Sequence, residues 1–196
     1  MSDTLIVYAH PNHEGHCGVI LRELQKELDH RQDGYEVLDL YALGFDPVLK
    51  ADEHYASNHR NITPGNRELQ EKIRQAKRLV FIYPVWWQNV PAILKGFIDR
   101  VFTPGFAFEY QANGFPRGLL PGRRAAVFAT SGAPRFFAKF MAGDRALKVL
   151  VRDTLKFCGL SAKGFAVGSA GQLTPKNWIR ISKTVQRGLA YLFAGV

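Results

Sequence analysis

Three short segments of the chain combine residue types that suit the binding of a small ligand: residues 10–17, 84–90 and 131–137. Each follows an apolar run of the kind that forms a strand buried on both faces. In an open parallel sheet, ligands bind beyond the carboxyl ends of the strands, because the loops that follow them meet at one edge. The sequence therefore predicts one site built from three loops that lie far apart along the chain.

The first segment, residues 10–17, suits a phosphate because it leads into a predicted helix. The free N–H groups and positive dipole end of a helix attract anions, and Gly15 and Gly18 let the backbone approach a ligand closely. Histidines at positions 10, 13 and 16 also suggest a metal, but one short loop rarely supplies a complete ligand set, so we expect no metal site. A third interpretation is a polar turn that only begins the helix.

The second segment carries Trp86 and Trp87, two of the three tryptophans of the chain, between Pro84 and Pro91. Large aromatic side chains are costly to expose in a loop unless they have a partner. A planar aromatic cofactor laid against this loop would be such a partner. The alternative is that one or both indoles cover the core or an interface between subunits.

The third segment follows the fourth predicted strand and begins Thr130-Ser131-Gly132-Ala133-Pro134. Its hydroxyls, its glycine and its backbone amides are suited to the polar edge of a ring. Turns of this composition are common, so this segment alone carries little weight. The convergence of the three segments at one sheet edge is what predicts the site.

An alternation of apolar strands and amphipathic helices positions these segments. We expect strands at 5–9, 35–40, 79–83, 125–130 and 162–167, helices at 19–28, 67–77, 91–101, 144–157 and 175–194, a long excursion with one helical turn at 44–66, and a loop or short hairpin at 103–122. This order predicts an α/β fold, because parallel strands need crossover connections. The expected architecture is a flavodoxin-like three-layer sandwich, with a five-stranded parallel sheet of order 2-1-3-4-5 and helices on both faces. One domain is expected to cover residues 1–196.

Composition narrows the range of partners. The chain has 196 residues, a formal net charge of +9 and a pI near 9.7. Its Lys and Arg residues look scattered, which disfavours a nucleic-acid partner, whereas anionic small ligands explain the same excess. Two cysteines are too few for a disulfide scaffold. The sequence shows no signal peptide and no membrane-spanning run, so we expect a cytoplasmic protein that is not integral to a membrane.

Residues 83–102 resemble the signature of a known family. Their sequence, YPVWWQNVPAILKGFIDRVF, is close to P-x-x-W-x-x-x-P-A-x-L-K-G-x-x-[DE]-R-V of the NAD(P)H quinone reductases of the flavodoxin-like superfamily. That family includes DT-diaphorase and bacterial relatives that act as quinone reductases or as ancillary subunits of potassium-efflux systems. Residues 5–11, 39–48 and 157–159 are similar to other family segments, so the resemblance covers nearly the whole chain.

The resemblance implies a flavin-dependent NAD(P)H oxidoreductase that reduces quinones or similar small acceptors by two-electron ping-pong transfer. It implies bound FAD, with FMN as the alternative, and NAD(P)H as the electron donor. The flavin-binding residues that it implies are His10, Gly15, His16, Cys17, Pro84, Val85, Trp86, Trp87, Gln88, Thr130, Ser131 and Gly132. Relatives are dimers with the acceptor pocket at the subunit interface, and for that pocket the resemblance implies Phe106, Phe108 and Phe137. The alternative function is a flavin- or dinucleotide-binding regulatory or ancillary subunit of a membrane transporter.

Two departures from the family pattern concern the flavin. Gly15-His16-Cys17 stands where relatives often have Ser-Phe-Asn, and Ala133 stands where they have a second glycine. The first departure changes the expected phosphate contacts. We further expect Cys17, at a helix start, to be a reactive thiolate that bound flavin protects. The alternative is that Cys17 is a small apolar residue packed under the loop.

Overall fold

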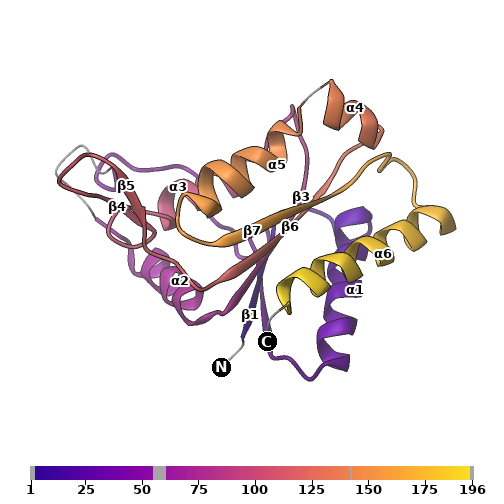
Figure 1. The fold of residues 1–196 in the computed structure, drawn as a ribbon, viewed down its shortest axis with the longest axis horizontal. Helices are drawn as coiled ribbons and strands as arrows, with labels where there is room; N and C mark the ends of the chain where they lie inside the picture. The colour runs from indigo at the N-terminus through magenta and orange to yellow at the C-terminus, as the bar shows by residue number, and fades with distance from the viewer. Residues whose placement is uncertain (1–2, 55–60, 142, 195–196) are drawn as a thin grey trace.

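Five parallel strands form the central sheet of the computed structural model, in the order β2-β1-β3-β6-β7 (Figure 1). The structure describes residues 3–54, 61–141 and 143–194. The strands are β1 (Thr4–Tyr8), β2 (Tyr35–Asp39), β3 (Arg78–Pro84), β6 (Arg124–Thr130) and β7 (Ser161–Val167). The predicted flavodoxin-like order is thereby confirmed, since β6 and β7 are the fourth and fifth strands of the sheet.

Helices cover both faces of the sheet. They are α1 (His16–His30), α2 (Pro64–Gln75), α3 (Ala92–Val101), α4 (Arg135–Phe140), α5 (Arg145–Leu150), which continues as a π-helical segment (Val151–Lys156), and α6 (Pro175–Leu192). α1 and α6 pack on one face, over Ile6, Val80 and Phe128. None of the described helices has both the length and the apolar character needed to cross a membrane.

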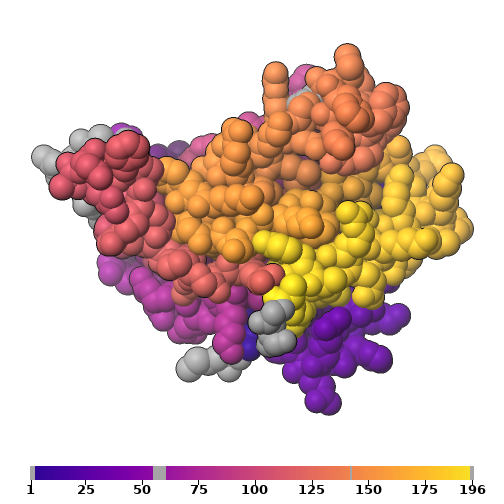
Figure 2. Space-filling model, viewed as in Figure 1, coloured from indigo at the N-terminus to yellow at the C-terminus, as the bar shows by residue number. Residues whose placement is uncertain are grey.

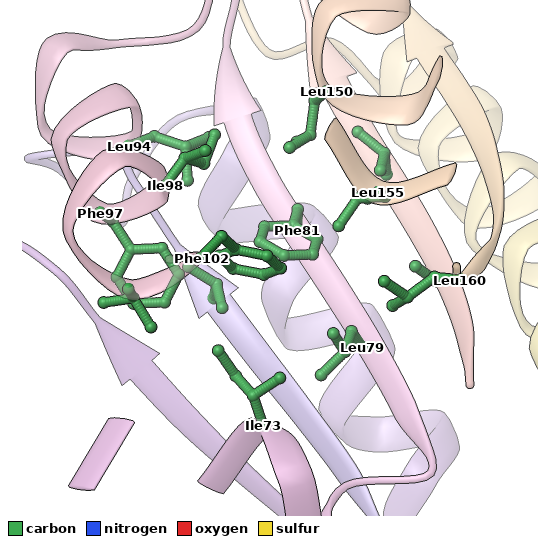
Figure 3. Close-up of a cluster of buried hydrophobic side chains, with 14 of the residues drawn as sticks. Ile73, Leu79, Phe81, Leu94, Phe97, Ile98, Phe102, Leu150, Leu155 and Leu160 are labelled. Atoms are coloured by element: carbon green, nitrogen blue, oxygen red, sulfur yellow. The ribbon is translucent and has the colours of Figure 1, made fainter. Parts of the chain in front are cut away.

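The opposite face of the sheet packs against α2, α3 and α5. Figure 3 shows Leu79 and Phe81 of β3 between Phe97 of α3 and Leu155 of the π-helical segment. Because strand residues alternate between faces, this core and the one under α1 and α6 are separate. Both cores hold the strands in a register that brings Tyr8, Pro84, Thr130 and Val167 to the same sheet edge.

The long excursion after β2 is fastened to α3. The Arg100 guanidinium donates hydrogen bonds of 2.6 and 2.8 Å to the carboxylate of Glu53, and both side chains are buried. A Cβ added at Gly96 would lie 2.2 Å from the carbonyl oxygen of Pro47, so only glycine allows this approach. The part of the excursion at 55–60 lies outside the described residues.

The clearest differences from the prediction are at α2 and α4, whereas the hairpin allowed for at 103–122 is present. α2 begins at Pro64 rather than at residue 67, because Thr63 caps it by accepting a hydrogen bond from the backbone N–H of Asn66. α4 was not expected, and none of its residues with a described environment is buried. The loop or hairpin expected at 103–122 contains an antiparallel pair, β4 (Phe108–Tyr110) and β5 (Pro116–Gly118).

Candidate flavin site

The three predicted loops meet around one cavity of about 320 Å³ at the carboxyl edge of the sheet. Ten of the twelve expected flavin-binding residues line it. The lining residues are His10, Gly15, His16, Cys17, Pro84, Val85, Trp86, Thr130, Ser131, Gly132, Ala170 and Gly171. The structure thus brings together residues from loops that are more than a hundred positions apart, as the strand-end argument predicted.

The helix α1 presents a bare N-terminus to this cavity. Gly15 is its N-cap and has no side chain to accept a hydrogen bond. The N–H of Val19 bonds to the carbonyl of Gly15 at 3.0 Å. Within the part of the chain that the structure describes, the N–H groups of His16, Cys17 and Gly18 have no hydrogen-bond partner. These free donors and the helix dipole favour an anion such as a phosphate.

His16 adds a second signal for an anion. Its side chain is only 5% exposed, and its Nε2 atom is buried without a hydrogen-bond partner. Burial lowers the pKa of His16, and the nearby positive charge of Arg180 lowers it further. Since buried polar atoms nearly always have a partner, the orphaned imidazole nitrogen marks this part of the cavity as a candidate ligand site.

Arg180 of α6 was not among the predicted site residues. Its Nε atom is also buried without a partner, while its Nη2 donates to Asn177 Oδ1 at 2.9 Å. Its proximity to His16 depends on the packing of α6 against α1, which the sequence does not display. The only available signal was its place in the basic stretch between Lys176 and Arg187.

Cys17 is not a reactive thiolate in this structure. Its side chain is 2% exposed, and its Sγ lies 3.3 Å from Thr130 Oγ1. Burial raises the pKa of the thiol to about 12, although the contact with Thr130 lowers it slightly. Desolvation of the charged form therefore outweighs the helix dipole, and the expectation of a low pKa was wrong.

The loop after β3 forms a tight two-residue turn at Trp87 and Gln88. Trp86 and Asn89 close it with reciprocal backbone hydrogen bonds of 3.1 and 2.9 Å. Both turn residues have positive φ, 51° and 56°, a conformation that is strained for side chains other than glycine. Trp86 lines the cavity, with its ring centroid 6.2 Å from that of His10.

The other two members of the expected set lie elsewhere. The Trp87 side chain is fully exposed and does not line the cavity. Gln88 lines a separate, small cavity together with Val85 and Ser131. Trp87 therefore projects from the tip of the turn into solvent, whereas Gln88 turns toward the ends of β3 and β6, beside Val85 and Ala129.

The loop after β6 is hydrogen-bonded to a fourth loop, which follows β7. The N–H of Ser131 bonds to Val167, and the carbonyl of Ser131 accepts from the N–H of Ala170 at 2.8 Å. Held by these bonds, residues 170–171 form part of the cavity wall. The sequence prediction missed them, although Gly168-Ser169-Ala170-Gly171 is a segment of small residues at another strand end.

The three loop histidines do not converge on a common point. His13 Nε2 lies 2.6 Å from Asp39 Oδ2, and His10 Nδ1 contacts the backbone of Asn12. His16 is instead buried at the cavity. Among the described residues, no group of three or more His, Cys, Asp or Glu side chains is placed to hold a metal ion.

The three residues expected in an acceptor pocket lie apart. Phe106 is buried in the core, and Phe108 lines a different cavity of about 450 Å³ with Phe157 and Phe102. Phe137 is exposed on α4. In Figure 1 the β4–β5 hairpin lies at the far end of the molecule from α4. The ring of Phe106 turns into the core of its own chain, although Phe106 lies in the segment 103–122 that was expected to be a loop or short hairpin.

Comparison with known proteins places the chain among oxidoreductases. Residues 2–179 match the model of a family described as having a flavodoxin-like fold. An uncharacterized NAD(P)H oxidoreductase of Haemophilus influenzae is 32% identical over 159 residues, covering 80% of this chain and 78% of the relative. Human ribosyldihydronicotinamide dehydrogenase [quinone] is 32% identical over 176 residues, covering 79% and 76%.

A solved structure supports the fold independently. The FMN-dependent NADH-azoreductase of Bacillus anthracis, in complex with FMN, superposes with a TM-score of 0.71 at 20% identity, covering 95% of this chain and 99% of the other. The family resemblance drawn from the signature at residues 83–102 is confirmed by these matches. The chain belongs to the flavodoxin-like family of NAD(P)H quinone oxidoreductases, and it is an oxidoreductase enzyme.

Proposed function

We propose that this enzyme binds one flavin in the cavity at the carboxyl sheet edge and reduces quinones with electrons from NAD(P)H. The observation that carries the proposal is the bare N-terminus of α1 beside an orphaned, buried His16 nitrogen, in a cavity bordered by an indole. A flavin nucleotide has both a phosphate and a planar ring, which matches these two features. The names of the oxidoreductase relatives support the same chemistry.

The phosphate is expected at the start of α1. There it would accept hydrogen bonds from the N–H groups of Cys17 and Gly18, from the His16 imidazole and from Arg180. A Cβ added at Gly15, Gly132 or Gly171 would meet no protein atom within 4 Å, so backbone in the cavity wall is open to a ligand. The donor set is centred on one helix end, which suits a single phosphate.

FMN, with its single phosphate, is therefore the form of flavin that we propose. The FMN complex of the structurally similar azoreductase supports this choice. The initial expectation of FAD is not confirmed. Mass spectrometry of the ligand released by heating the purified protein distinguishes the two forms directly.

The ring is expected between the β3 and β6 loops. Val85 and Trp86 would lie along it, and the amides of residues 130–132 would face its polar edge. When bound, the flavin supplies the hydride chemistry itself. The chain's part is then to hold the phosphate, to orient the ring and to exclude water from one side of it. Because the single cavity would serve donor and acceptor in turn, we expect parallel lines in double-reciprocal kinetic plots.

A matched pair of variants tests the location of the flavin. Gly132→Phe should fill the cavity and weaken FMN binding at least about a hundredfold, since a ring in the cavity and the flavin exclude each other. Gly65→Phe is the control, because Gly65 is equally open but lies on α2, away from the cavity. Fluorescence titration with FMN measures both. No flavin binding by the folded wild-type protein, or equal affinity in the two variants, contradicts the proposal.

A further inference from the structure

The edge strand β7 has unpaired backbone groups along its outer side. It is the last strand of the sheet and pairs only with β6. The N–H of Ser161 bonds to the carbonyl of Arg123 at 2.9 Å, and the carbonyl of Val167 accepts from the N–H of Ser131 at 2.9 Å. Because alternate residues of a parallel strand pair with the same neighbour, the odd-numbered residues of β7 face β6. The other N–H and C=O groups point outward without a hydrogen-bond partner among the described residues, and they belong to Ala162, Gly164 and Ala166.

Two helical segments flank this edge and form one continuous face with it. β7 contacts both the π-helical segment and α6. A Cβ added at Gly164 would lie 2.9 Å from Leu147 of α5, and Lys163 Nζ lies 5.7 Å from the ring centroid of Tyr191 on α6. Figure 1 shows β7 with α5 and α6 on either side, and in Figure 2 the orange surface of residues 145–165 directly adjoins the yellow surface of α6.

Nearly all of the net positive charge of the chain lies in the part that builds this face. Residues 145–196 hold nine Lys and Arg residues and one acidic residue, Asp153, which is a formal charge of +8 out of the total of +9. Six of these cations are exposed on the elements of the face, and none except Arg152, which pairs with Asp153, forms an ion pair with a described residue. We call the six the basic edge: Lys148, Arg152, Lys156, Lys163, Lys183 and Arg187.

The basic edge lies on both sides of the unpaired strand. On the α5 side, Leu147 packs over Gly164, and the next residue along the helix is an exposed lysine. On the α6 side, Arg187 lies one helical turn before Tyr191, whose ring contacts Lys163. Alternate side chains of a strand added to β7 would point toward the two helices in turn, so both sets would meet cations.

The basic edge is separate from the proposed flavin site. None of its six residues lines the flavin cavity or the cavity beside Phe108. The residues expected in an acceptor pocket between subunits also lie outside α5, β7 and α6. This face therefore does not belong to the mouth of the cavity or to the hairpin.

Charge and hydrogen bonding together identify the occupant of this edge. A second copy paired through β7 would bring Lys163 against the same residue, and edge lysines oppose such pairing. Nucleic acid matches the charge, but a phosphate backbone has no N–H groups to donate to the outward carbonyls. Among the described residues of 143–172 and 180–194, no large apolar side chain is exposed to enter a bilayer. An extended acidic polypeptide matches both the cations and the strand edge.

We propose that β7 binds an acidic segment of a partner protein as an added strand. The outward N–H and C=O groups of β7 pair with the backbone of this segment. Its Asp and Glu side chains contact the cations of α5 on one side and those of α6 on the other. Because both sets of alternate side chains meet cations, the segment is acidic at consecutive positions. Flavin binding is not needed for this docking.

Binding of poly-L-glutamate to the full, flavin-loaded chain tests the charge requirement. Fluorescence anisotropy of the labelled polymer should show binding that high salt weakens, and poly-L-lysine should not bind. Lys148→Glu/Lys156→Glu should weaken the binding at least about tenfold, because it reverses two cations of the basic edge. The matched control, Lys26→Glu/Arg67→Glu, reverses two exposed cations on α1 and α2 and should keep the affinity.

Amide hydrogen exchange followed by NMR tests the added strand itself. The outward amides of residues 162, 164 and 166 should exchange at least about tenfold more slowly when poly-L-glutamate is bound. The outward amides of the opposite edge strand, β2, are the internal control and should not change. This measurement needs no substitution, so it remains decisive if a variant does not fold.

The other outcomes are distinct. Absence of poly-L-glutamate binding, or equal losses in the two charge-reversal variants, overturns the proposal. Binding that leaves the outward amides of β7 unprotected is charge attraction without an added strand and also overturns it. Tighter binding of duplex DNA than of poly-L-glutamate overturns it in favour of nucleic acid. Dissociation of a dimer by Lys148→Glu/Lys156→Glu overturns it in favour of a contact between copies of this chain.

Discussion

His16 is the residue at which pH should act on this site. Burial and Arg180 lower its pKa below 6.5, so the imidazole is neutral in the ligand-free protein at neutral pH. A bound phosphate dianion would raise that pKa, so binding takes up a proton. We therefore expect FMN affinity to increase as the pH falls from about 8 to about 6.5, by at most about tenfold per pH unit for one proton.

Riboflavin provides the control for this prediction, because it has the ring but no phosphate. Its affinity should show no such pH dependence, and His16→Phe should remove the dependence for FMN while keeping the fold. In the ligand-free protein, the free energy of unfolding should decrease as the pH falls. Near pH 6.5 the unfolded chain takes up a proton on His16, whereas the folded chain, in which the pKa of His16 is lowered, does not. An FMN affinity independent of pH would contradict the role given to His16.

Cys17 should be slow to react although it lies in the first turn of α1. Its thiol is buried against Thr130, and burial raises its pKa to about 12, so the reactive thiolate is scarce at pH 8. Brief maleimide labelling followed by peptide mapping should leave Cys17 unmodified in the presence and absence of flavin. Cys158, which is buried with a pKa raised in the same way, is the internal comparison. Rapid labelling of Cys17 alone would show that the first turn opens in solution.

At the scale of elements, the β3 turn stores backbone strain. Gln88 has a φ of 56° in a two-residue turn whose first position, Trp87, is also left-handed. Glycine takes this conformation without a Cβ clash, so Gln88→Gly should stabilise the fold by about 1 kcal/mol. The same change at the exposed helical position Gln186 should destabilise it by about 1 kcal/mol. Urea unfolding of both variants measures the two signs, and a loss of stability in Gln88→Gly would contradict the strain argument.

The strands could be predicted from the sequence because their signal is local. Apolar runs such as residues 79–83 end at prolines or polar turns, and their predicted limits lie within one residue of the observed strands. α4 could not be predicted, because residues 135–140 have no buried face and so no periodic apolar stripe. In this element the aromatic side chains serve the surface rather than the core.

The site was predictable only as far as strand order places loops together. The register of β1, β3 and β6 brings three of the loops to one edge, which the alternation of elements already implied. Ala170 and Arg180 were missed because their positions depend on tertiary contacts: a hydrogen bond to Ser131, and the packing of α6 on α1. The burial of Cys17 likewise depends on Thr130, which is 113 positions away.

At the scale of the whole molecule, we expect a second subunit to complete the acceptor pocket. Within one chain, Phe108 and its cavity lie by the hairpin, at the other end of the sheet from α4 (Figure 1). A hairpin wall could therefore reach a flavin only if it came from a partner. Tyr110 and Phe115, 61% and 71% exposed on the hairpin, offer apolar surface for that contact. We accordingly predict a homodimer in which each hairpin completes the other subunit's acceptor pocket.

A hairpin variant tests whether quinone reduction needs the dimer while flavin binding does not. Tyr110→Asp/Phe115→Asp should give a monomer in sedimentation equilibrium, because two buried carboxylates would face apolar surface across the interface. The monomer should keep its FMN, since the flavin cavity is built from one chain, but should lose quinone reduction at least about tenfold with the missing wall. Leu43→Asp/Val48→Asp is the control, because it adds the same charges at exposed positions outside the hairpin. A monomeric wild type, or a monomeric variant with full activity toward quinones, would mean that each chain builds its acceptor pocket alone.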